Sequence, residues 1–181
     1  MKIGIIIGTI REGRVGASVG KWVYDFAANR NDEGVTYELV DLKDYSLPLL
    51  GVAPTEQQGA AIGAWSAKMA SFDGYVFVTG EYNRSIPGAF KNALDFLKPE
   101  LANKPVGYVG YGGLGGTFAI AALRVSNAQQ QLAGVRTMVN FSLMADFENF
   151  TVFKPQPYHA MNMNGMLDEL LVWAKAFKTI R

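Results

Sequence analysis

The sequence of 181 residues contains no cysteine and a single histidine. The absence of cysteine excludes disulfides, zinc–thiolate centres, iron–sulfur clusters and thiol nucleophiles. It is compatible with a reducing compartment, so we expect a cytoplasmic protein. We also expect no metal site.

Excess charge of either sign and long apolar runs are missing as well. Lysine and arginine total 17, and aspartate and glutamate total 16, which leaves a formal net charge of +1. A nearly neutral chain is not typical of proteins that bind nucleic acid by neutralising phosphates. No apolar run approaches the roughly 20 residues of a membrane helix, and the N-terminal MKIGIIIGT is too short for a signal peptide. We therefore expect neither nucleic acid nor a membrane as a partner.

Hydrophobic residues are abundant, at 49%, and their spacing alternates between strand and helix patterns. Apolar runs predict strands over residues 3–7, 35–42, 75–79, 106–111 and 137–143. Helical spacing predicts helices that include residues 19–27, 62–72, 90–97, 118–132 and 163–177. This alternation indicates an α/β/α sandwich around a parallel sheet, for which the common strand order is 2-1-3-4-5. We expect one domain over residues 1–181.

Three unusual loops are expected at the same place in this fold. In an open parallel sheet, ligands bind beyond the carboxyl ends of the strands, where the strand order reverses. Strands 1 and 3 flank that point, and the loops that leave them cover residues 9–17 and 80–85. The exit of strand 4, GYGGLGG, lies beside them. We predict that one crevice between these loops holds the ligand.

The first loop, GTIREGRVGAS, has the composition of a phosphate-binding loop. Hydroxyl groups, guanidinium groups and the free backbone N–H groups of a helix start all suit an anion. A solvated loop in which Ser18 is the helix N-cap is the alternative. The Gly-Lys-Ser/Thr of a Walker A motif is absent, which argues against phosphoryl transfer.

The exit of the third strand, GEYNRS, is longer than a connection to the next helix requires. A longer path lays peptide groups along a planar ligand, with Tyr82 and Ile86 as apolar faces. Asn83 and Ser85 are positioned to bond the edges of a heterocycle. Ser85 is also expected to be the N-cap of the next helix, close to Pro87.

Two partial motifs suggest other functions. GASVG, at residues 16–20, matches the nucleophile elbow of serine hydrolases, and Asp146 and His159 follow in the hydrolase order. An elbow serine directly follows a strand, whereas Ser18 lies ten residues past Gly8, which disfavours a hydrolase. The second motif, the dinucleotide fingerprint, is matched by Gly110, Gly112 and Gly115. It lies on the wrong strand and has no acidic residue about 20 positions later.

The segment 141–161 is rich in aromatic residues and methionine but has weak periodicity. Local packing over the edge of the sheet is one interpretation. A subunit interface or a lid is the other.

The segments GTIREGRVGASVGKWV, TGEYNRSIPGAFKNALDFL and VGYVGYGGLGGTFAIAALR resemble the signatures of the NADPH-dependent FMN reductase family. This family comprises flavodoxin-like quinone, azo-dye and chromate reductases with a 2-1-3-4-5 sheet. The similarity covers about residues 2–140, and E-Y-N-x-S-x-P-G is its most specific part. Gly80 is a departure, because the family usually has proline before Glu-Tyr-Asn.

The resemblance implies an enzyme with bound FMN and with NADPH or NADH as co-substrate. Hydride would pass through N5 of the flavin to a quinone-like or other small acceptor in a ping-pong cycle, with no catalytic side chain. A homodimer or homotetramer is implied as well. The implied phosphate and ribityl contacts are Thr9, Arg11, Arg14, Val15, Gly16 and Ser18. The implied isoalloxazine contacts are Glu81, Tyr82, Asn83 and Ser85, together with Gly112, Gly113 and Gly116 from the fourth strand.

Two alternatives remain beside the reductase. A flavodoxin-type electron carrier binds the same cofactor, but such carriers tend to be strongly acidic, unlike this chain. A degenerate family member that binds phosphate without flavin is the other.

Overall fold

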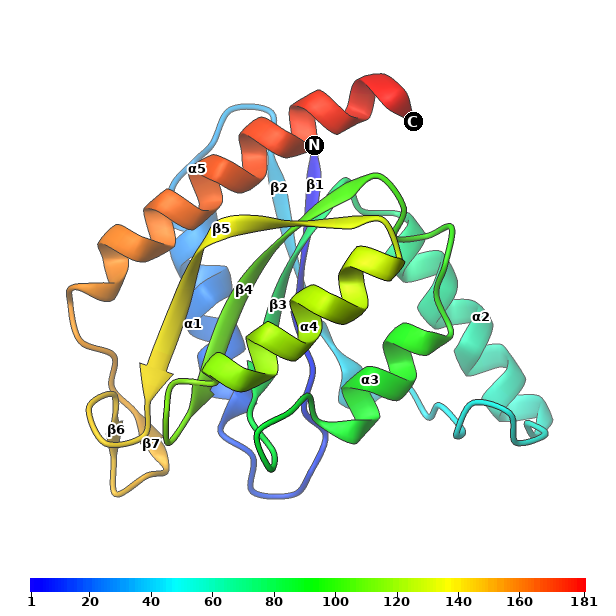
Figure 1. The fold of residues 1–181 in the computed structure, drawn as a ribbon, viewed down its shortest axis with the longest axis horizontal. Coiled ribbons are helices and arrows are strands. Elements are labelled where there is room, and N and C mark those ends of the chain that lie inside the picture. Colours follow the sequence, from blue (N-terminus) through cyan, green and yellow to red (C-terminus); the bar gives the residue numbers. More distant parts are fainter.

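The computed structural model describes residues 1–181 and contains a five-stranded parallel sheet in the order β2-β1-β3-β4-β5 (Figure 1). The strands are β1 (Lys2–Ile7), β2 (Thr36–Asp41), β3 (Gly74–Gly80), β4 (Lys104–Gly112) and β5 (Leu132–Ser142). The predicted order and the predicted flavodoxin-like architecture are confirmed.

Helices cover both faces of the sheet (Figure 1). They are α1 (Gly16–Asn29), α2 (Glu56–Ala70), α3 (Gly88–Asp95), α4 (Thr117–Gln129) and α5 (His159–Phe177). Successive side chains of a strand point to opposite faces, so Val76 and Val78 of β3 pack with α1 and α5, whereas Tyr75 and Phe77 pack with α2, α3 and α4. Because both faces are buried, the central strands read as continuous apolar runs.

The predicted element boundaries differ most from the structure at the starts of β5 and α2. Leu132, assigned to the fourth helix, begins β5 instead, and it is buried opposite Lys104 of β4. The chain reverses at Gln131, whose φ of 55° ends the helical path. The second helix begins at Glu56, six residues before Ile62, where the apolar pattern began, because Thr55 and Gln58 form a capping box there.

The edge of the sheet where the strands begin is held by ion pairs. Asp73 lies close to Lys178 and Arg181 and accepts a hydrogen bond from the backbone N–H of Lys2. Glu38 pairs with the side chains of both Lys2 and Lys68, at 2.7 Å in each case. The two chain ends therefore lie near each other at this edge (Figure 1).

Lys104 is a buried cation at the same edge. Its ammonium group donates to the carbonyl of Ala70, at the end of α2, and lies 3.1 Å from the hydroxyl of Tyr75. Burial lowers the pKa of Lys104 to about 8 and raises the pKa of Tyr75. The lysine thus satisfies the open carbonyls of a helix end from inside the protein.

Beyond β5, the chain forms a small hairpin of β6 (Phe147–Glu148) and β7 (Val152–Phe153). Its inner side packs locally over the sheet, as one interpretation of this segment predicted, with Phe153 against Trp22 and Phe141. In the hairpin and the segments that flank it, five large apolar side chains are exposed, namely Met144, Phe150, Val152, Tyr158 and Met161. None of the helices combines the length and hydropathy that crossing a bilayer requires.

Candidate functional site

The loops that leave β1, β3 and β4 lie side by side at the carboxyl edge of the sheet (Figure 1). The hydroxyl of Thr9, in the first loop, lies 2.9 Å from the hydroxyl of Tyr111 on β4. The guanidinium of Arg11 lies over the Tyr82 ring of the β3 loop, 5.8 Å from its centroid. The structure thus brings together the three segments that the sequence placed in one crevice.

Helix α1 begins at Gly16 and has an open N-terminus. Its N-cap is Val15, and no side chain caps the amides of the first turn. Ser18 is therefore not the N-cap, so the alternative in which Ser18 caps this helix is wrong. Its hydroxyl donates back to the carbonyl of Val15, at 2.7 Å. The first-turn N–H groups remain available to an anion.

Gly16 fits where no side chain can. A Cβ atom at this position would lie 2.4 Å from the Thr9 hydroxyl and 2.5 Å from the Tyr111 hydroxyl. Both of these residues are buried, and burial raises the pKa of Tyr111 to about 12. The Thr9–Tyr111 contact therefore fixes the first loop against β4 and brings the start of α1 close to the sheet.

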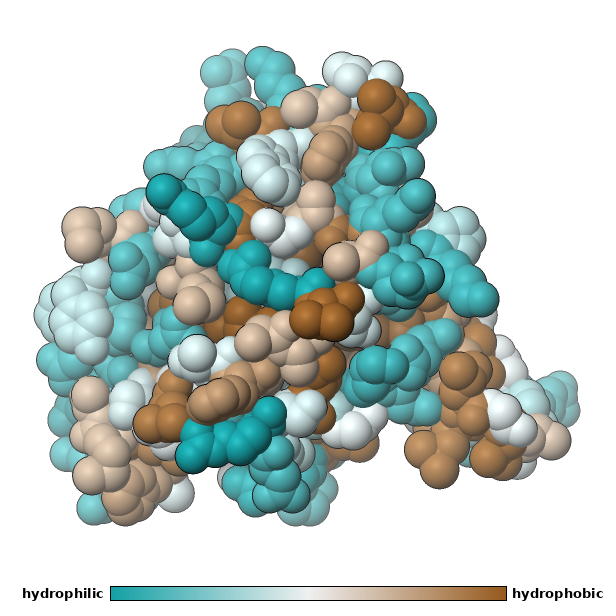
Figure 2. Space-filling model, viewed as in Figure 1, coloured by the Kyte–Doolittle hydropathy of each residue, from teal (hydrophilic) through white to brown (hydrophobic).

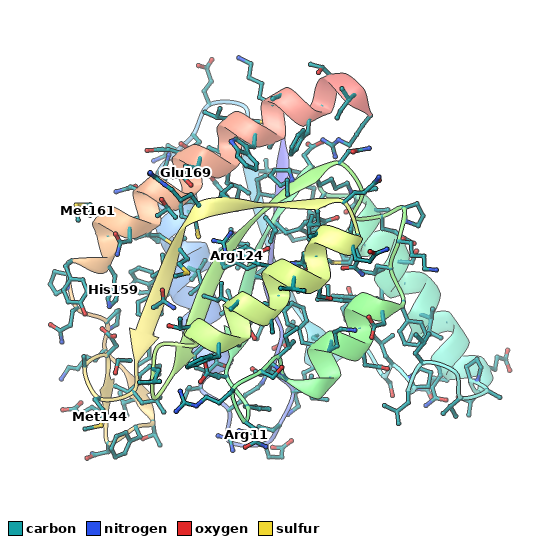
Figure 3. All side chains as sticks on the ribbon, in the orientation of Figure 1. Arg11, Arg124, Met144, His159, Met161 and Glu169 are labelled. Carbon is teal, nitrogen blue, oxygen red and sulfur yellow. The ribbon has the colours of Figure 1, made fainter.

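The two arginines of the first loop have different partners. Arg14 forms a bidentate pair with Asp41 at the end of β2 and donates to the carbonyl of Thr9. Hydrogen bonding to Asp41 raises the pKa of Arg14, whose side chain is 10% exposed. Arg11 is exposed, forms no ion pair, and projects at the carboxyl edge (Figure 3). Arg14 thus braces the loop, while Arg11 keeps a free cation for a ligand.

The exit of β3 is a tight turn. The backbones of Tyr82 and Ser85 exchange two hydrogen bonds, of 3.1 and 3.0 Å. Between them, Asn83 and Arg84 both have positive φ, at 49° and 62°, as in a type I′ turn. The N-cap of α3 is Pro87, so the prediction of Ser85 as a cap was also wrong.

Glu81 links this turn to the N-terminus of α4. Its carboxylate accepts hydrogen bonds from the backbone N–H groups of Phe118, at 2.9 Å, and Ala119, at 3.4 Å. An acidic side chain at a helix N-terminus is favoured by the helix dipole. Glu81 therefore couples the β3 loop to α4 through one carboxylate oxygen, Oε2.

The exit of β4 is built on close backbone approaches. A Cβ atom on Gly116, whose φ is 73°, would lie 2.7 Å from the backbone nitrogen of Tyr111. Asn140 of β5 holds the loop by donating to the carbonyl of Gly115, at 2.8 Å. Gly112 is buried at the end of the strand, whereas Gly113 is exposed and has open space where a side chain would be. The peptide groups at Gly113 are therefore accessible to a flat ligand.

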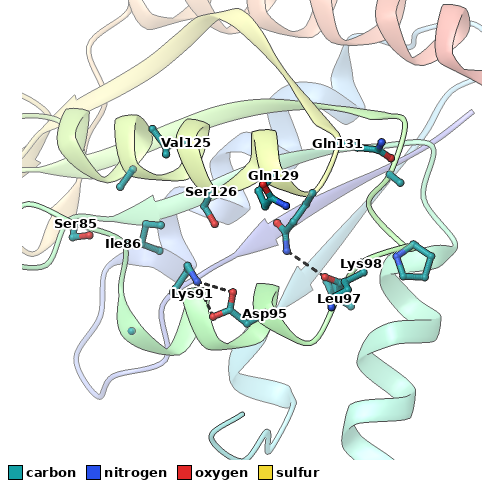
Figure 4. Close-up of a pocket in the computed structure, with 15 residues that line it drawn as sticks. Ser85, Ile86, Lys91, Asp95, Leu97, Lys98, Val125, Ser126, Gln129 and Gln131 are labelled. Carbon is teal, nitrogen blue, oxygen red and sulfur yellow. Dashed lines mark hydrogen bonds and ion pairs between the residues drawn. The ribbon is translucent and has the colours of Figure 1, made fainter. Parts of the chain in front are cut away.

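The largest hollow lies elsewhere, in a groove between α3 and α4 (Figure 4). It has a volume of about 1290 Å³ and reaches from Ser85 and Ile86, at the carboxyl edge, to Gln131 at the opposite edge. The Lys91–Asp95 pair, 2.6 Å apart, crosses its wall. Of the predicted site residues, only Ser85 lines this groove, so the predicted site is not the groove itself.

Residues 1–147 match the family described as NADPH-dependent FMN reductase. The chain belongs to this family. It is 38% identical over 133 residues to the NAD(P)H-dependent FMN reductase ntnL of Nectria sp., a match that covers 69% of this chain. The chain spans about two thirds of the length of that relative, 66%.

Two further proteins extend the comparison for this FMN reductase family member. A 2-hydroxy-1,4-benzoquinone reductase of Burkholderia sp. is 30% identical over 147 residues, 80% of this chain and 74% of that protein. The solved structure of FerB, a flavoenzyme NAD(P)H:(acceptor) oxidoreductase from Paracoccus denitrificans, has a TM-score of 0.71 at 20% identity. It covers 97% of this chain and 98% of its own and shows the shared fold.

Ser18, Asp146 and His159 do not form the catalytic triad of a serine hydrolase in this FMN reductase family member. Asp146 and His159 are buried and paired at 2.9 Å. Asp146 also accepts from the backbone N–H groups of Ser142 and Gln156, so the pair ties the hairpin segment to α5. Ser18 bonds to its own helix start instead of to His159. No group of three histidine, aspartate or glutamate side chains is placed to hold a metal ion.

Sequence reasoning missed three residues that shape the site. Tyr111 contacts the first loop and lies 3.2 Å from where a Cβ of Gly80 would be, yet its sequence context is that of a core strand residue. Asp41 and Asn140 act through contacts with distant segments. Of these three, only Asp41 could have been suspected from the sequence, because it lies at the end of a predicted strand.

Proposed function

We propose that the protein is an FMN-dependent NAD(P)H oxidoreductase that reduces a quinone-like or other small acceptor. One observation carries the proposal: an uncapped helix N-terminus with a free arginine lies beside the accessible glycine backbone of the β4 exit. An anionic tail and a flat ring require these two features together. Residues 1–181 would form a single FMN-binding domain.

The β1–α1 loop is the proposed site of the FMN phosphate. Arg11 supplies the charge, and the amides of the first turn of α1, with the hydroxyl of Ser18, supply donors. Thr9, Arg14, Val15 and Gly16 shape this loop, through the contacts to Tyr111 and Asp41. The residues present therefore fit a phosphate monoester.

The exits of β3 and β4 are the proposed walls for the isoalloxazine ring. Tyr82 is half-buried and offers an apolar face, and Asn83 and Ser85 lie on the same exposed turn. Glu81 holds this wall to α4. The opposite wall is the backbone of Gly112, Gly113 and Gly116, which offers peptide groups without side chains.

FMN, when bound, supplies the redox chemistry, which is why no protein nucleophile is required. The chain's own residues hold the phosphate, border the ring and leave one side of it open to solvent. Because NAD(P)H and the acceptor would both reach the ring from its open side, we propose that they occupy that side in turn. Parallel lines in double-reciprocal plots would support this ping-pong order, and intersecting lines would contradict it.

A homodimer or homotetramer is part of the proposal. Apolar side chains interrupt the polar surface over α4 (Figure 2). On α4 and the loop before it, Leu114, Phe118 and Val125 are exposed, and Val125 is 77% exposed. Contiguous exposed apolar surface is typical of an interaction site. Sedimentation equilibrium is expected to show a dimer or tetramer for the native chain and a smaller species for Val125→Glu.

We also propose a cytoplasmic location, because NAD(P)H is an intracellular reductant. Cell fractionation would test it: recovery of the protein in the soluble intracellular fraction is expected, and recovery outside the cell would contradict it.

The visible absorption spectrum of the purified protein is the first test. We expect the two absorption bands of bound flavin, and rapid NADPH oxidation when a quinone is added without any protein partner. Bound flavin without such turnover would favour the flavodoxin-type carrier. A colourless protein that takes up no added FMN would overturn the proposal.

A further inference from the structure

The turn at the exit of β3 contains an arginine in an unfavourable backbone conformation. Asn83 and Arg84 occupy the two central positions, and Arg84 has a φ of 62°. Turns of this type favour Asn-Gly, because glycine adopts positive φ without strain. Asn83 suits its position, but Arg84 does not. Strain of this kind gathers at functional sites, where a side chain is needed in one place.

The guanidinium of Arg84 is held in place by an aromatic ring. It lies 4.8 Å from the ring centroid of Phe118, in the first turn of α4. The turn itself is anchored by the backbone bonds between Tyr82 and Ser85 and by Glu81, which bonds the amides of α4. The cation is therefore presented on the rim of the crevice by a supported scaffold.

Arg84 also lacks an acidic partner. Its guanidinium forms no ion pair with any carboxylate, including that of Glu81, whose Oε2 accepts hydrogen bonds from α4. The other arginines pair with carboxylates or carbonyls, with the exception of Arg11. Two exposed cations thus flank one crevice, and the proposed function uses only one of them, Arg11, for the flavin phosphate.

We propose that Arg84 binds the 2′-phosphate of NADPH and makes the enzyme prefer NADPH to NADH. This inference rests on the proposed function. The 2′-phosphate is the only group that distinguishes the two co-substrates, and a planar guanidinium binds such a phosphate through two parallel hydrogen bonds. Arg84 lies on the exposed tip of its turn, outside the glycine-lined wall. The end of the dinucleotide remote from the nicotinamide is the part that reaches such a rim.

The variant Arg84→Gly separates this role from a structural one. It removes the guanidinium and gives the turn its favoured residue, so the melting temperature is expected to stay equal or rise. The KM for NADPH is expected to rise about tenfold or more, as for the loss of a charge-assisted hydrogen bond. The KM for NADH, kcat and the FMN content are expected to stay within about twofold, because NADH lacks the group that Arg84 binds. Arg84→Lys should recover part of the NADPH preference.

Phe150→Gly is the matched control. Phe150 follows Asn149 in the hairpin between β6 and β7, and it also has positive φ, at 59°. It is 57% exposed and carries no charge. The substitution is expected to relieve the same kind of backbone strain and to leave both KM values unchanged.

Calorimetric titration of the FMN-loaded protein with 2′,5′-ADP and 5′-AMP gives a readout that is independent of turnover. The native protein is expected to bind 2′,5′-ADP more tightly, and Arg84→Gly is expected to bind both equally. If Arg84→Gly weakened NADPH and NADH equally, or left both unchanged, the role of Arg84 would be overturned while the reductase function stood. A native protein that bound FMN and oxidised neither co-substrate would overturn the proposed function and this inference together.

Discussion

The two edges of the central sheet solve opposite problems. Where the strands begin, acidic and basic groups are paired: Asp73 with Lys178 and Arg181, and Glu38 with Lys2 and Lys68. Where the strands end, Arg11 and Arg84 have no acidic partner and the start of α1 is uncapped. The first edge closes the fold, and the second keeps groups free for a ligand.

The difference shows that the loops carrying free polar groups at the carboxyl edge are themselves held in place by hydrogen bonds to neighbouring elements. Arg14 is fixed by Asp41, Thr9 by Tyr111, and Glu81 by α4. Each of these contacts orients a loop whose neighbouring residues remain available. If the comparison is right, substitutions at the carboxyl edge alter ligand affinity, and substitutions at the opposite edge alter only stability.

The largest effect is expected for Gly16→Ala. The new methyl group would overlap the Thr9 and Tyr111 hydroxyls, at 2.4 and 2.5 Å. We expect a loss of about 1–3 kcal/mol in the free energy of unfolding and protein purified without FMN. Gly59→Ala is the control, because Gly59 lies in α2 with open space around it and should gain about 1 kcal/mol. Retention of FMN at native affinity by Gly16→Ala would contradict the proposed loop geometry.

Arg11→Ala is expected to raise the dissociation constant of FMN by about 10- to 100-fold, the effect of losing a charge-assisted hydrogen bond. Thermal stability without FMN should not change, because Arg11 is exposed and forms no ion pair. Fluorescence titration of the apoprotein with FMN measures this dissociation constant. Arg14→Ala, in contrast, should lower the stability of the apoprotein, because it leaves Asp41 without its partner. Equal stability losses in the two variants would erase the distinction between them.

Lys104, at the edge where the strands begin, makes the stability of the protein depend on pH. Its folded pKa of about 8 lies below the usual value of 10.5, so the unfolded chain binds more protons between these two values. Stability from this group therefore rises with pH, by about 1 kcal/mol between pH 8 and 9. Denaturant unfolding of the native chain and of Lys104→Met, compared across this range, should show the rise in the native chain only. If Lys104 made stability fall as pH rises, this would contradict the lowering of its pKa by burial.

The smallest effect is expected for Asp73→Asn. Burial alone raises the pKa of Asp73, but the Lys2 N–H, Lys178 and Arg181 outweigh it and hold the pKa below its usual range. The carboxylate thus stabilises the fold above the unfolded pKa, and this contribution is lost as pH falls through the folded value. We expect about 0.5–1 kcal/mol of destabilisation at pH 7 and unchanged FMN affinity. Weakened FMN binding would show that the two edges are coupled.

The fold was readable from the sequence because its central strands are buried on both faces. Val76 and Phe77 face opposite layers, yet both are apolar, and that pattern marks a covered parallel strand. Helix starts were less readable. Ser18 and Ser85 have the side chains of N-caps, but the chain begins α1 at Gly16 and closes a turn at Ser85.

The site was readable in its location but not in its internal contacts. Parallel strands place their exits at one edge, so the convergence of three loops followed from topology alone. The pairing of Arg14 with Asp41, and of Thr9 with Tyr111, joins residues that are distant in sequence. Neither residue type nor spacing distinguishes an arginine that braces a loop from one that is free.

A crystal structure of the protein soaked with FMN is the most direct test. The phosphate should lie against the first turn of α1 within hydrogen-bonding distance of Arg11, with the ring between Tyr82 and Gly113. Flavin in the larger groove between α3 and α4, or a phosphate far from α1, would contradict the assignment of the carboxyl edge as the cofactor site.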